Sequence, residues 1–249
     1  MKPNFPPCVY AETLLELPNL SASDLHVSAQ YLPMIMEYYR QSLLLSQKAL
    51  DYLDANYGIS SVVAQSYRIG YSDRSLGLEL PSTKNGAGEI LRGSLKRLRL
   101  FKGTGHEAFR GCIVVPVMSG DSIAGFYAER IDRARRHAKA HYFIRLYSHC
   151  LFATSQCDGQ PEVYLCASPL HAIQLEGSIH QPVFATDPSL NISDDDCAHL
   201  MGAGVNSVIV VAQSDTAPEH LKQLAKKLKK FGLKYRKIDN FSEVTYGTA

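Results

Sequence analysis

Residues 207–238 read SVIVVAQSDTAPEHLKQLAKKLKKFGLKYRKI, and this stretch decides the fold class. Its first part, 207–212, is nearly all Val and Ile, which is typical of a buried strand. Leucines then recur at helical spacing after Pro218, a residue that suits a first helical turn, until Gly232 ends the pattern. A second strand is expected at 234–238, so the stretch predicts two parallel strands joined by a crossover helix.

Two further strand–helix pairs precede this unit. Apolar runs at 162–166 and 182–186 are expected to be strands, with helices starting at Pro169 and after Ser193. Three aspartates follow Ser193 and suit the positive end of a helix dipole, so the acidic run needs no metal to explain it. The alternation of strands and helices predicts a parallel α/β sandwich over residues 159–249.

The residues before this unit follow a different pattern. Apolar residues recur at helical spacing over 31–53, and we interpret residues 1–47 as a helical N-terminal extension. The runs 112–118 and 122–131 are joined by Ser-Gly-Asp, which predicts a β-hairpin. We therefore expect an α+β subdomain over residues 48–158, and the whole chain is expected to be an α/β protein.

The composition is that of an ordinary globular protein. The chain has 249 residues, of which 45% are hydrophobic and 20% are charged, which excludes disorder, collagen and coiled coil. No apolar run approaches the ~18 residues that a membrane-spanning helix needs, and the first residues lack the pattern of a signal peptide. The six cysteines form no C-x-x-C pair, which argues against a zinc ribbon. We expect a cytoplasmic protein without a membrane partner.

The net charge of +2 conceals a strong segregation of charge along the chain. Residues 84–141 carry 12 basic and 5 acidic groups, and residues 142–221 carry 1 and 9. Residues 222–249 carry 8 basic and 2 acidic groups. Such segregation suggests a surface that binds a polyanion, although each excess could simply solvate a face. The same two interpretations stay open for a row of lysines at Lys222, Lys226, Lys227, Lys229 and Lys230.

Several motifs resemble one known family. FRGCIVVPV at 109–117, followed by IAGFYAER at 123–130, is similar to R-F-R-x-R-I-M-F-P-I and V-I-G-F-G-G-R of bacterial DnaG-type primases. Upstream, YRIGYS at 67–72 resembles the F-x-I-G-(Y/F)-A segment of the same family. The resemblance covers about residues 48–240. It implies a primase catalytic core, in which a basic N-terminal subdomain is followed by a Toprim-like α/β fold.

The chain departs from this family where metal chemistry would occur. The resemblance implies a glutamate after the first Toprim strand and a D-x-D after the third, which together hold divalent metals against nucleotide phosphates. These positions read Ala167 and Gln213-Ser214-Asp215. Asp215 is therefore the one residual catalytic candidate, with Asp187 nearby and Asp239 a doubtful match. We expect no catalytic site, no metal and no cofactor, and Mg²⁺ enters only under an alternative.

Unlike the acidic metal positions, the basic residues of the primase-like subdomain are present in this chain. In the family this subdomain carries a groove for single-stranded template, and Arg110, Arg130 and Lys139 match or lie near its basic motif positions. Lys and Arg side chains along a backbone give sequence-independent, salt-sensitive affinity. The predicted nucleic-acid-binding residues are Lys96, Arg97, Arg99, Lys102, Arg110, Arg130, Lys139 and Arg145.

The first hypothesis is a catalytically degenerate primase-like protein that binds single-stranded or branched DNA. It would serve as an accessory factor in DNA replication or recombination, with a mobile element as one setting and residues 1–47 as a docking element for a partner protein. One alternative is an active metal-dependent primase or Toprim nucleotidyltransferase built from Asp187, Asp215 and Asp239. The other is a protein-interaction scaffold with no nucleic-acid role.

Overall fold

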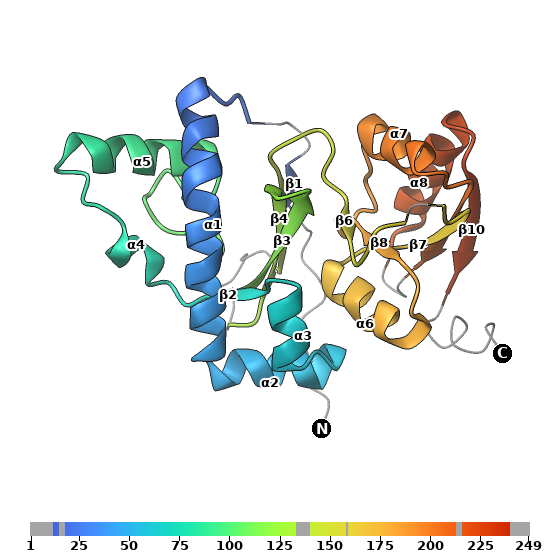
Figure 1. The fold of residues 1–249 in the computed structure, drawn as a ribbon, viewed down its shortest axis with the longest axis horizontal. Helices are drawn as coiled ribbons and strands as arrows, with labels where there is room; N and C mark the ends of the chain where they lie inside the picture. Colours follow the sequence, from blue (N-terminus) through green and yellow to red (C-terminus); the bar gives the residue numbers. More distant parts are fainter. Residues whose placement is uncertain (1–11, 15–17, 133–139, 158, 213–215, 240–249) are drawn as a thin grey trace.

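The protein consists of two lobes that lie side by side (Figure 1). The computed structural model describes residues 12–14, 18–132, 140–157, 159–212 and 216–239. We call residues 12–146 the N-terminal lobe and residues 150–239 the C-terminal lobe. Each lobe is built around a five-stranded sheet. None of the helices in the described ranges is both long and apolar enough to span a bilayer.

The sheet of the N-terminal lobe is mostly antiparallel, with strand order β1-β5-β4-β3-β2. Its strands are β1 (Glu12–Leu14), β2 (Gly70–Ser72), β3 (Cys112–Ser119), β4 (Ser122–Arg130) and β5 (His141–Arg145). The predicted hairpin is confirmed as β3 and β4, which meet at a turn where Gly120 has a positive φ of 58°. The first strand, β1, pairs in parallel with β5 and was not predicted.

Five helices complete the N-terminal lobe in the described ranges. They are α1 (Ala22–Leu44), α2 (Gln47–Tyr57), α3 (Ser61–Ser66), α4 (Leu76–Glu79) and α5 (Gly86–Arg97). The helical stretch expected at 31–53 is thus two helices. Helix α1 ends at its C-cap, Leu45, and Ser46 is the N-cap that starts α2. A capping box between Ser21 and Asp24 starts α1, and Gly58 ends α2 in the left-handed conformation.

Helix α1 is part of the core of the N-terminal lobe. Its inward side chains, among them Leu32, Met36 and Tyr39, are buried in the same apolar cluster as Leu95 of α5 and Phe126 of β4. The interpretation of residues 1–47 as an appended extension is therefore wrong for α1. The periodicity did indicate a helix, but a chain segment cannot show by itself which body its apolar face will cover.

The C-terminal lobe has the predicted α/β architecture, with strand order β10-β9-β7-β8-β6. Its strands are β6 (Phe152–Ala153), β7 (Glu162–Cys166), β8 (Val183–Ala185), β9 (Ser207–Val211) and β10 (Lys234–Ile238). Its helices are α6 (Pro169–Ile179), α7 (Asp194–Gly202) and α8 (Pro218–Lys230). All strand pairs are parallel except β6 with β8. Because β6 belongs to this sheet, the lobe begins before the boundary expected at residue 159.

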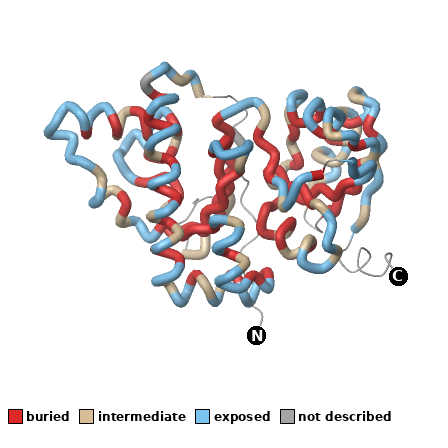
Figure 2. Tube along the Cα trace, viewed as in Figure 1, coloured by how far each residue is buried: buried red, intermediate tan, exposed pale blue. Residues whose placement is uncertain are grey.

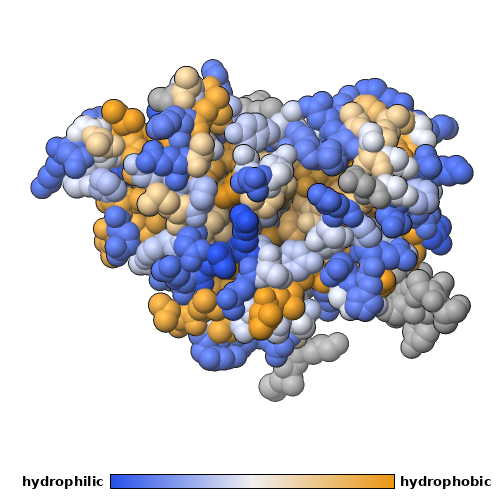
Figure 3. Space-filling model, in the orientation of Figure 1, coloured by the Kyte–Doolittle hydropathy of each residue, from blue (hydrophilic) through white to orange (hydrophobic). Residues whose placement is uncertain are grey.

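Buried residues concentrate in the strands and on the helix faces turned toward them (Figure 2). One apolar cluster spans both lobes, since it joins Val115 and Phe143 of the N-terminal sheet to Cys166 and Leu170 of the C-terminal lobe. Hydrophilic residues cover much of the outer rim of the C-terminal lobe, while apolar residues reach the surface where α1 meets α2 and α3 (Figure 3). The two lobes therefore meet through a shared core.

The crossing of α1 over β2 can be tested with Gly70→Ala. The added methyl would lie 2.5 Å from Cβ of Tyr39 and 2.8 Å from its carbonyl carbon, so the helix or the strand has to move. We expect the free energy of unfolding to fall by about 1–3 kcal/mol in urea denaturation. Gly177→Ala in α6 is the matched control, because nothing lies within 4 Å of its added methyl. That variant should gain about 0.5–1 kcal/mol, and equal effects of the two substitutions would contradict this packing.

Candidate functional site

The carboxyl end of β7 is where the resemblance places a metal-binding glutamate. The residue there is Ala167, only 5% exposed, and it offers a methyl group in place of a carboxylate. The next residue, Ser168, is the N-cap of α6, and its Oγ accepts a hydrogen bond of 3.2 Å from the amide of Leu170. This strand end is therefore built to start a helix, and its side chains carry no charge.

A buried carboxylate lies across the lobe boundary from Ser168. Glu129 of β4 is 4% exposed and accepts hydrogen bonds from three phenols. The donors are Tyr52 and Tyr57 of α2, the latter at 2.7 and 2.9 Å, and Tyr127 of β4 at 2.8 Å. The hydroxyl of Ser168 donates to Tyr127 at 3.1 Å and so joins the C-terminal lobe to this tyrosine–glutamate network.

Two histidines border the tyrosine–glutamate network. Nδ1 of His141 lies 2.9 Å from the hydroxyl of Tyr127 and 3.7 Å from Glu129. The ring of His171, on α6, packs edge-on against Tyr57 with 4.9 Å between centroids. Burial, together with the charge of Glu129, raises the pKa of Tyr57 and Tyr127 well above the ordinary value. Both phenols therefore remain protonated donors to the carboxylate.

Sequence reasoning missed this network, although a signal was present. The segment GFYAER at 125–130 is one residue longer than the family's G-F-G-G-R and carries Tyr127 and Glu129 in a region of small residues. A bulky phenol and a carboxylate placed there must find partners, because a buried polar group without a hydrogen bond costs free energy. Two phenol donors, Tyr52 and Tyr57, come from α2, a helix in which the sequence analysis selected no site residue.

The remaining acidic candidates do not form a shared metal site in the described residues. Asp187, after β8, is buried, and its Oδ1 accepts hydrogen bonds from the amides of Ser189 at 2.8 Å and Asn191 at 3.2 Å, which shapes that loop. Asp239, after β10, is exposed and pairs with Lys237. Because β9 and β7 lie between β10 and β8, these strand ends are about 14 Å apart. Asp215 lies outside the described residues.

The donor set therefore does not fit the divalent metals of the family. Metal-bound phosphate chemistry needs several carboxylate oxygens around one ion. In the part of the chain that the structure describes, no group of three or more His, Cys, Asp and Glu side chains could hold an ion. Glu129, which is linked to Ser168 at the end of β7 through Tyr127, already accepts hydrogen bonds from three phenols.

Two of the predicted DNA-binding arginines pair with buried acids, and burial argues against a DNA contact for one of them, Arg145. Arg145 is 4% exposed and forms an ion pair with the buried Asp196 of α7. Arg97 pairs with the buried Asp24 at 2.7 Å and keeps the pKa of that carboxyl well below its ordinary value. Each arginine pairs with a buried acid from a distant part of the chain. Arg145 is enclosed with its partner, whereas the side chain of Arg97 remains 49% exposed.

The other predicted basic residues lie on or near the surface of the N-terminal lobe. Lys96 and Lys102 are exposed, and Arg99, Arg110 and Arg130 are partly exposed. Lys139 lies outside the described residues. The structure brings Arg110 and Arg130 together at one end of the β3–β4 hairpin, since Arg130 donates to the carbonyl of Arg110 at 2.6 Å. Arg130 also donates to the hydroxyl of Tyr142 at 2.9 Å, which holds its guanidinium in place.

Two cations that the sequence analysis did not select belong to the same end of the sheet. Lys48 of α2 and Arg74, just after β2, both bind the carboxylate of Asp132, each at 2.5 Å. Asp132 follows β4 closely, so this group lies beside the end of the hairpin that carries Arg130. The two cations are 60% and 45% exposed, and one carboxylate offsets only part of their charge.

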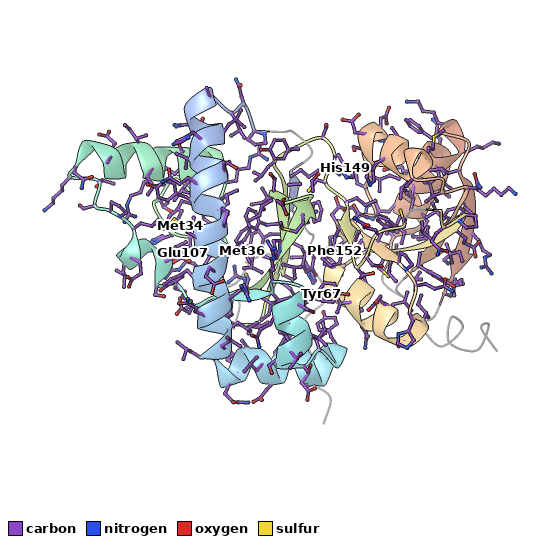
Figure 4. The ribbon with its side chains drawn as sticks, in the orientation of Figure 1. Met34, Met36, Tyr67, Glu107, His149 and Phe152 are labelled. Carbon is purple, nitrogen blue, oxygen red and sulfur yellow. The ribbon has the colours of Figure 1, made fainter. Side chains whose placement is uncertain are left out.

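The lobes are also tied at the segment that joins them. His149 lies there, and Tyr67 and Phe152 approach one another lower in the lobe boundary (Figure 4). The rings of Tyr67 and Phe152 are 6.2 Å apart, and Nδ1 of His149 lies 3.1 Å from Asp196. Asp196 also accepts from the amide of Cys150 at 2.9 Å. The polar and apolar contacts together hold the two lobes in one arrangement.

Comparison with known proteins was informative only at the level of structure. No protein-family model and no curated protein matches the chain. The Aquifex aeolicus primase, solved as its zinc-binding and RNA polymerase domains, aligns with a TM-score of 0.66 at 18% identity, over 91% of this chain and 57% of that one. The chain has the fold of a DnaG primase core. A DnaG primase catalytic domain bound to ssDNA aligns with a TM-score of 0.69 at 15% identity, over 88% of this chain and 73% of that one.

The primase resemblance read from loose motifs is thus confirmed for the fold. The chain spans 57% of the length of the Aquifex primase structure. The primase fold positions the end of β7, the β3–β4 hairpin and the lobe boundary as described above. At these identities the comparison establishes architecture, and the chemistry has to be argued from the side chains.

Replacing Arg145 by Met tests whether this arginine is structural. Removing one partner of a buried ion pair leaves Asp196 charged and poorly paired, and we expect a loss of about 3–5 kcal/mol in the free energy of unfolding. The control is Arg236→Met, which removes an exposed pair with Glu162 and should cost less than about 1 kcal/mol. A small effect of Arg145→Met in urea denaturation would return Arg145 to the set of available cations.

The lowered pKa of Asp196 predicts how the free energy of unfolding depends on pH. Burial alone would raise the pKa of Asp196, but hydrogen bonds from His149 and Arg145 bring it well below the ordinary 3.8. The folded protein therefore binds fewer protons than the unfolded chain, so this stabilisation is present above pH 3.8 and is lost as pH falls below it. Asp196→Asn should flatten the decline in stability between about pH 5 and pH 2. Asp195→Asn, at an exposed neighbour, should leave that decline unchanged.

Proposed function

We propose that this chain is a catalytically degenerate primase-like protein that binds single-stranded or branched DNA. It would act as an accessory factor in DNA replication or recombination. The observation that carries the proposal is the end of β7, where the buried Ala167 occupies the position of the expected metal ligand and Ser168 is hydrogen-bonded to the tyrosine–glutamate network.

The loss of catalysis follows from the electrostatics of that strand end. Nucleotidyl transfer requires divalent cations to neutralise phosphate charge, and such cations require clustered carboxylates. Ala167 supplies none, and the oxygens of Glu129 are already hydrogen-bonded to phenols. An ion placed there would have to displace those donors and would gain only one carboxylate.

The capacity to bind DNA follows from the cations at the surface of the N-terminal lobe. Lys96, Lys102 and Arg110 reach solvent, and Arg130 is oriented by Tyr142. Contacts of this type bind phosphates without reading sequence. One of the solved structures with the same fold is a DnaG catalytic domain bound to ssDNA, which supports single-stranded DNA as the first ligand to test.

A partner protein could use the outward face of α1, within residues 1–47. Leu25 and Met34 are exposed there, at 43% and 61%, while the inward face of the helix is buried. An interaction assay should therefore use surface substitutions such as Met34→Glu. Deleting residues 1–47 would remove core side chains and unfold the lobe.

The function is tested by fluorescence-anisotropy titration of labelled single-stranded, duplex and forked DNA across a salt series, with and without Mg²⁺. We expect binding to single-stranded DNA with a Kd of about 1 µM or tighter at low salt, weakening steeply with salt and independent of Mg²⁺. Lys102→Glu/Arg110→Glu should weaken it at least about tenfold, because two attractive contacts become repulsive. The control, Arg68→Glu/Lys84→Glu, carries the same charge change at exposed positions outside the predicted set.

The other outcomes separate the alternatives. No binding to any of these DNAs at low salt would favour a protein-interaction scaffold. A strict requirement for Mg²⁺ would favour an active nucleotidyltransferase, and its loss in Asp215→Asn would assign that residue to the site.

A further inference from the structure

Helix α8 carries a second set of cations, on the C-terminal lobe. Lys222, Lys226 and Lys229 are exposed, and their spacing of four and three residues places them on one face of the helix. We call these three residues the α8 lysine face. In Figure 1, α8 lies in the C-terminal lobe, away from the β3–β4 hairpin of the N-terminal lobe.

The other lysines of α8 have a structural role. Lys227 and Lys230 pair with Asp194 of α7 at 3.1 and 2.8 Å, and Lys227 also donates to the carbonyl of Ile192 at 2.8 Å. These two side chains anchor α8 to α7. They show that the lysine row divides into an anchoring set and the α8 lysine face.

The α8 lysine face has little acidic compensation. Lys222 lies 3.8 Å from Glu219 in a pair whose side chains are 76% and 70% exposed, a geometry that contributes little. Within the described ranges, no acidic side chain lies within ion-pair distance of Lys226 or Lys229. The charge on this face is therefore available to a ligand.

Two ordinary explanations account for only part of the lysine content. The helix dipole favours cations in the last turn, which covers Lys229 but not Lys222, near the start of α8. Charged residues on an edge strand discourage pairing with other chains. This explains Lys234 and Lys237 on the edge strand β10, but it does not explain lysines on a helix face. A row of lysines along α8 needs a further reason.

We propose that the α8 lysine face binds the phosphate backbone of duplex DNA. A rise of 1.5 Å per residue places Lys222 and Lys229 about 10 Å apart along α8, so their long side chains can contact neighbouring phosphates of one strand. Binding of a single strand gains affinity where bases stack on exposed aromatic rings. The nearby rings, Phe231 and Tyr235, are partly buried and pack against the core of the lobe. The face therefore suits a ligand that offers phosphates and keeps its bases inside.

This inference deepens the proposed function. It rests on that function for the part of the ligand that is single-stranded. The N-terminal lobe would hold the single strand and the α8 lysine face the adjoining duplex, so the preferred substrate is a junction between single- and double-stranded DNA. Residues 142–221, with 9 acidic and 1 basic group, lie between the two basic segments in the chain and favour two separate contacts over one continuous surface.

The test removes the charge of the α8 lysine face with the triple variant Lys222→Gln/Lys226→Gln/Lys229→Gln. The control is the matched Lys→Arg triple variant, which keeps the charge. Anisotropy titrations use a blunt duplex, a single strand and a single–double-strand junction. We expect the Gln variant to bind the duplex at least about tenfold more weakly and to lose about 2.7 from the slope of log K against log salt, for three phosphate contacts. Its affinity for the single strand should be unchanged, and the Arg variant should behave as wild type.

Each other result overturns the inference. Duplex affinity that is absent in wild type or unchanged in the Gln variant would remove the duplex contact. An equal loss for single strand and duplex would indicate a general effect of charge. Failure of the proposed function is distinguishable, because it would leave single-strand binding absent or insensitive to Lys102→Glu/Arg110→Glu while the duplex response to the Gln variant persists. Thermal unfolding followed by circular dichroism serves as the control that these exposed substitutions leave the fold intact.

Discussion

The buried carboxylate of Glu129 is the constraint on which the arrangement of the lobes depends. A carboxylate in a low-dielectric interior is costly unless donors surround it, and here three phenols do so. Two come from α2 and one from β4, and Tyr127 in turn accepts from Ser168 at the start of α6. These elements must be in place together for the carboxylate to be satisfied. The shared apolar cluster around Phe143 and Leu170 then adds burial to the same boundary.

The same network gives the end of β7 a structural role within the primase fold. A fold is stabilised by its core, while an activity depends on a few groups at strand ends. At the end of β7 the groups are Ala167 and Ser168, and Ser168 serves as a helix cap and as a link between lobes. The proposed role as a DNA-binding factor keeps the architecture and relies on surface cations.

The distribution of charge gives the proposed interaction its geometry. The buried Asp196 pairs with Arg145, which is itself buried and out of reach of a ligand, whereas Arg97 pairs with the buried Asp24 but stays 49% exposed. The predicted cations that remain exposed on the N-terminal lobe, such as Lys96 and Lys102, and those of the α8 lysine face lie on different lobes. Phosphate contacts are additive and salt-dependent, so two groups on different lobes suit a ligand that changes from single to double strand.

Local signals in the sequence were enough for much of the fold. The Val- and Ile-rich strand at 207–211, the Ser193 cap and the glycine after α8 all lie where the sequence predicts, because each depends on neighbours a few residues away. Tertiary structure alone decided the rest. Arg145 and Asp196 are 51 residues apart in the chain, and Tyr52 and Glu129 are 77 apart. Whether a charge is free or neutralised depends on such distant partners, and neither composition nor periodicity records which residues folding will bring together.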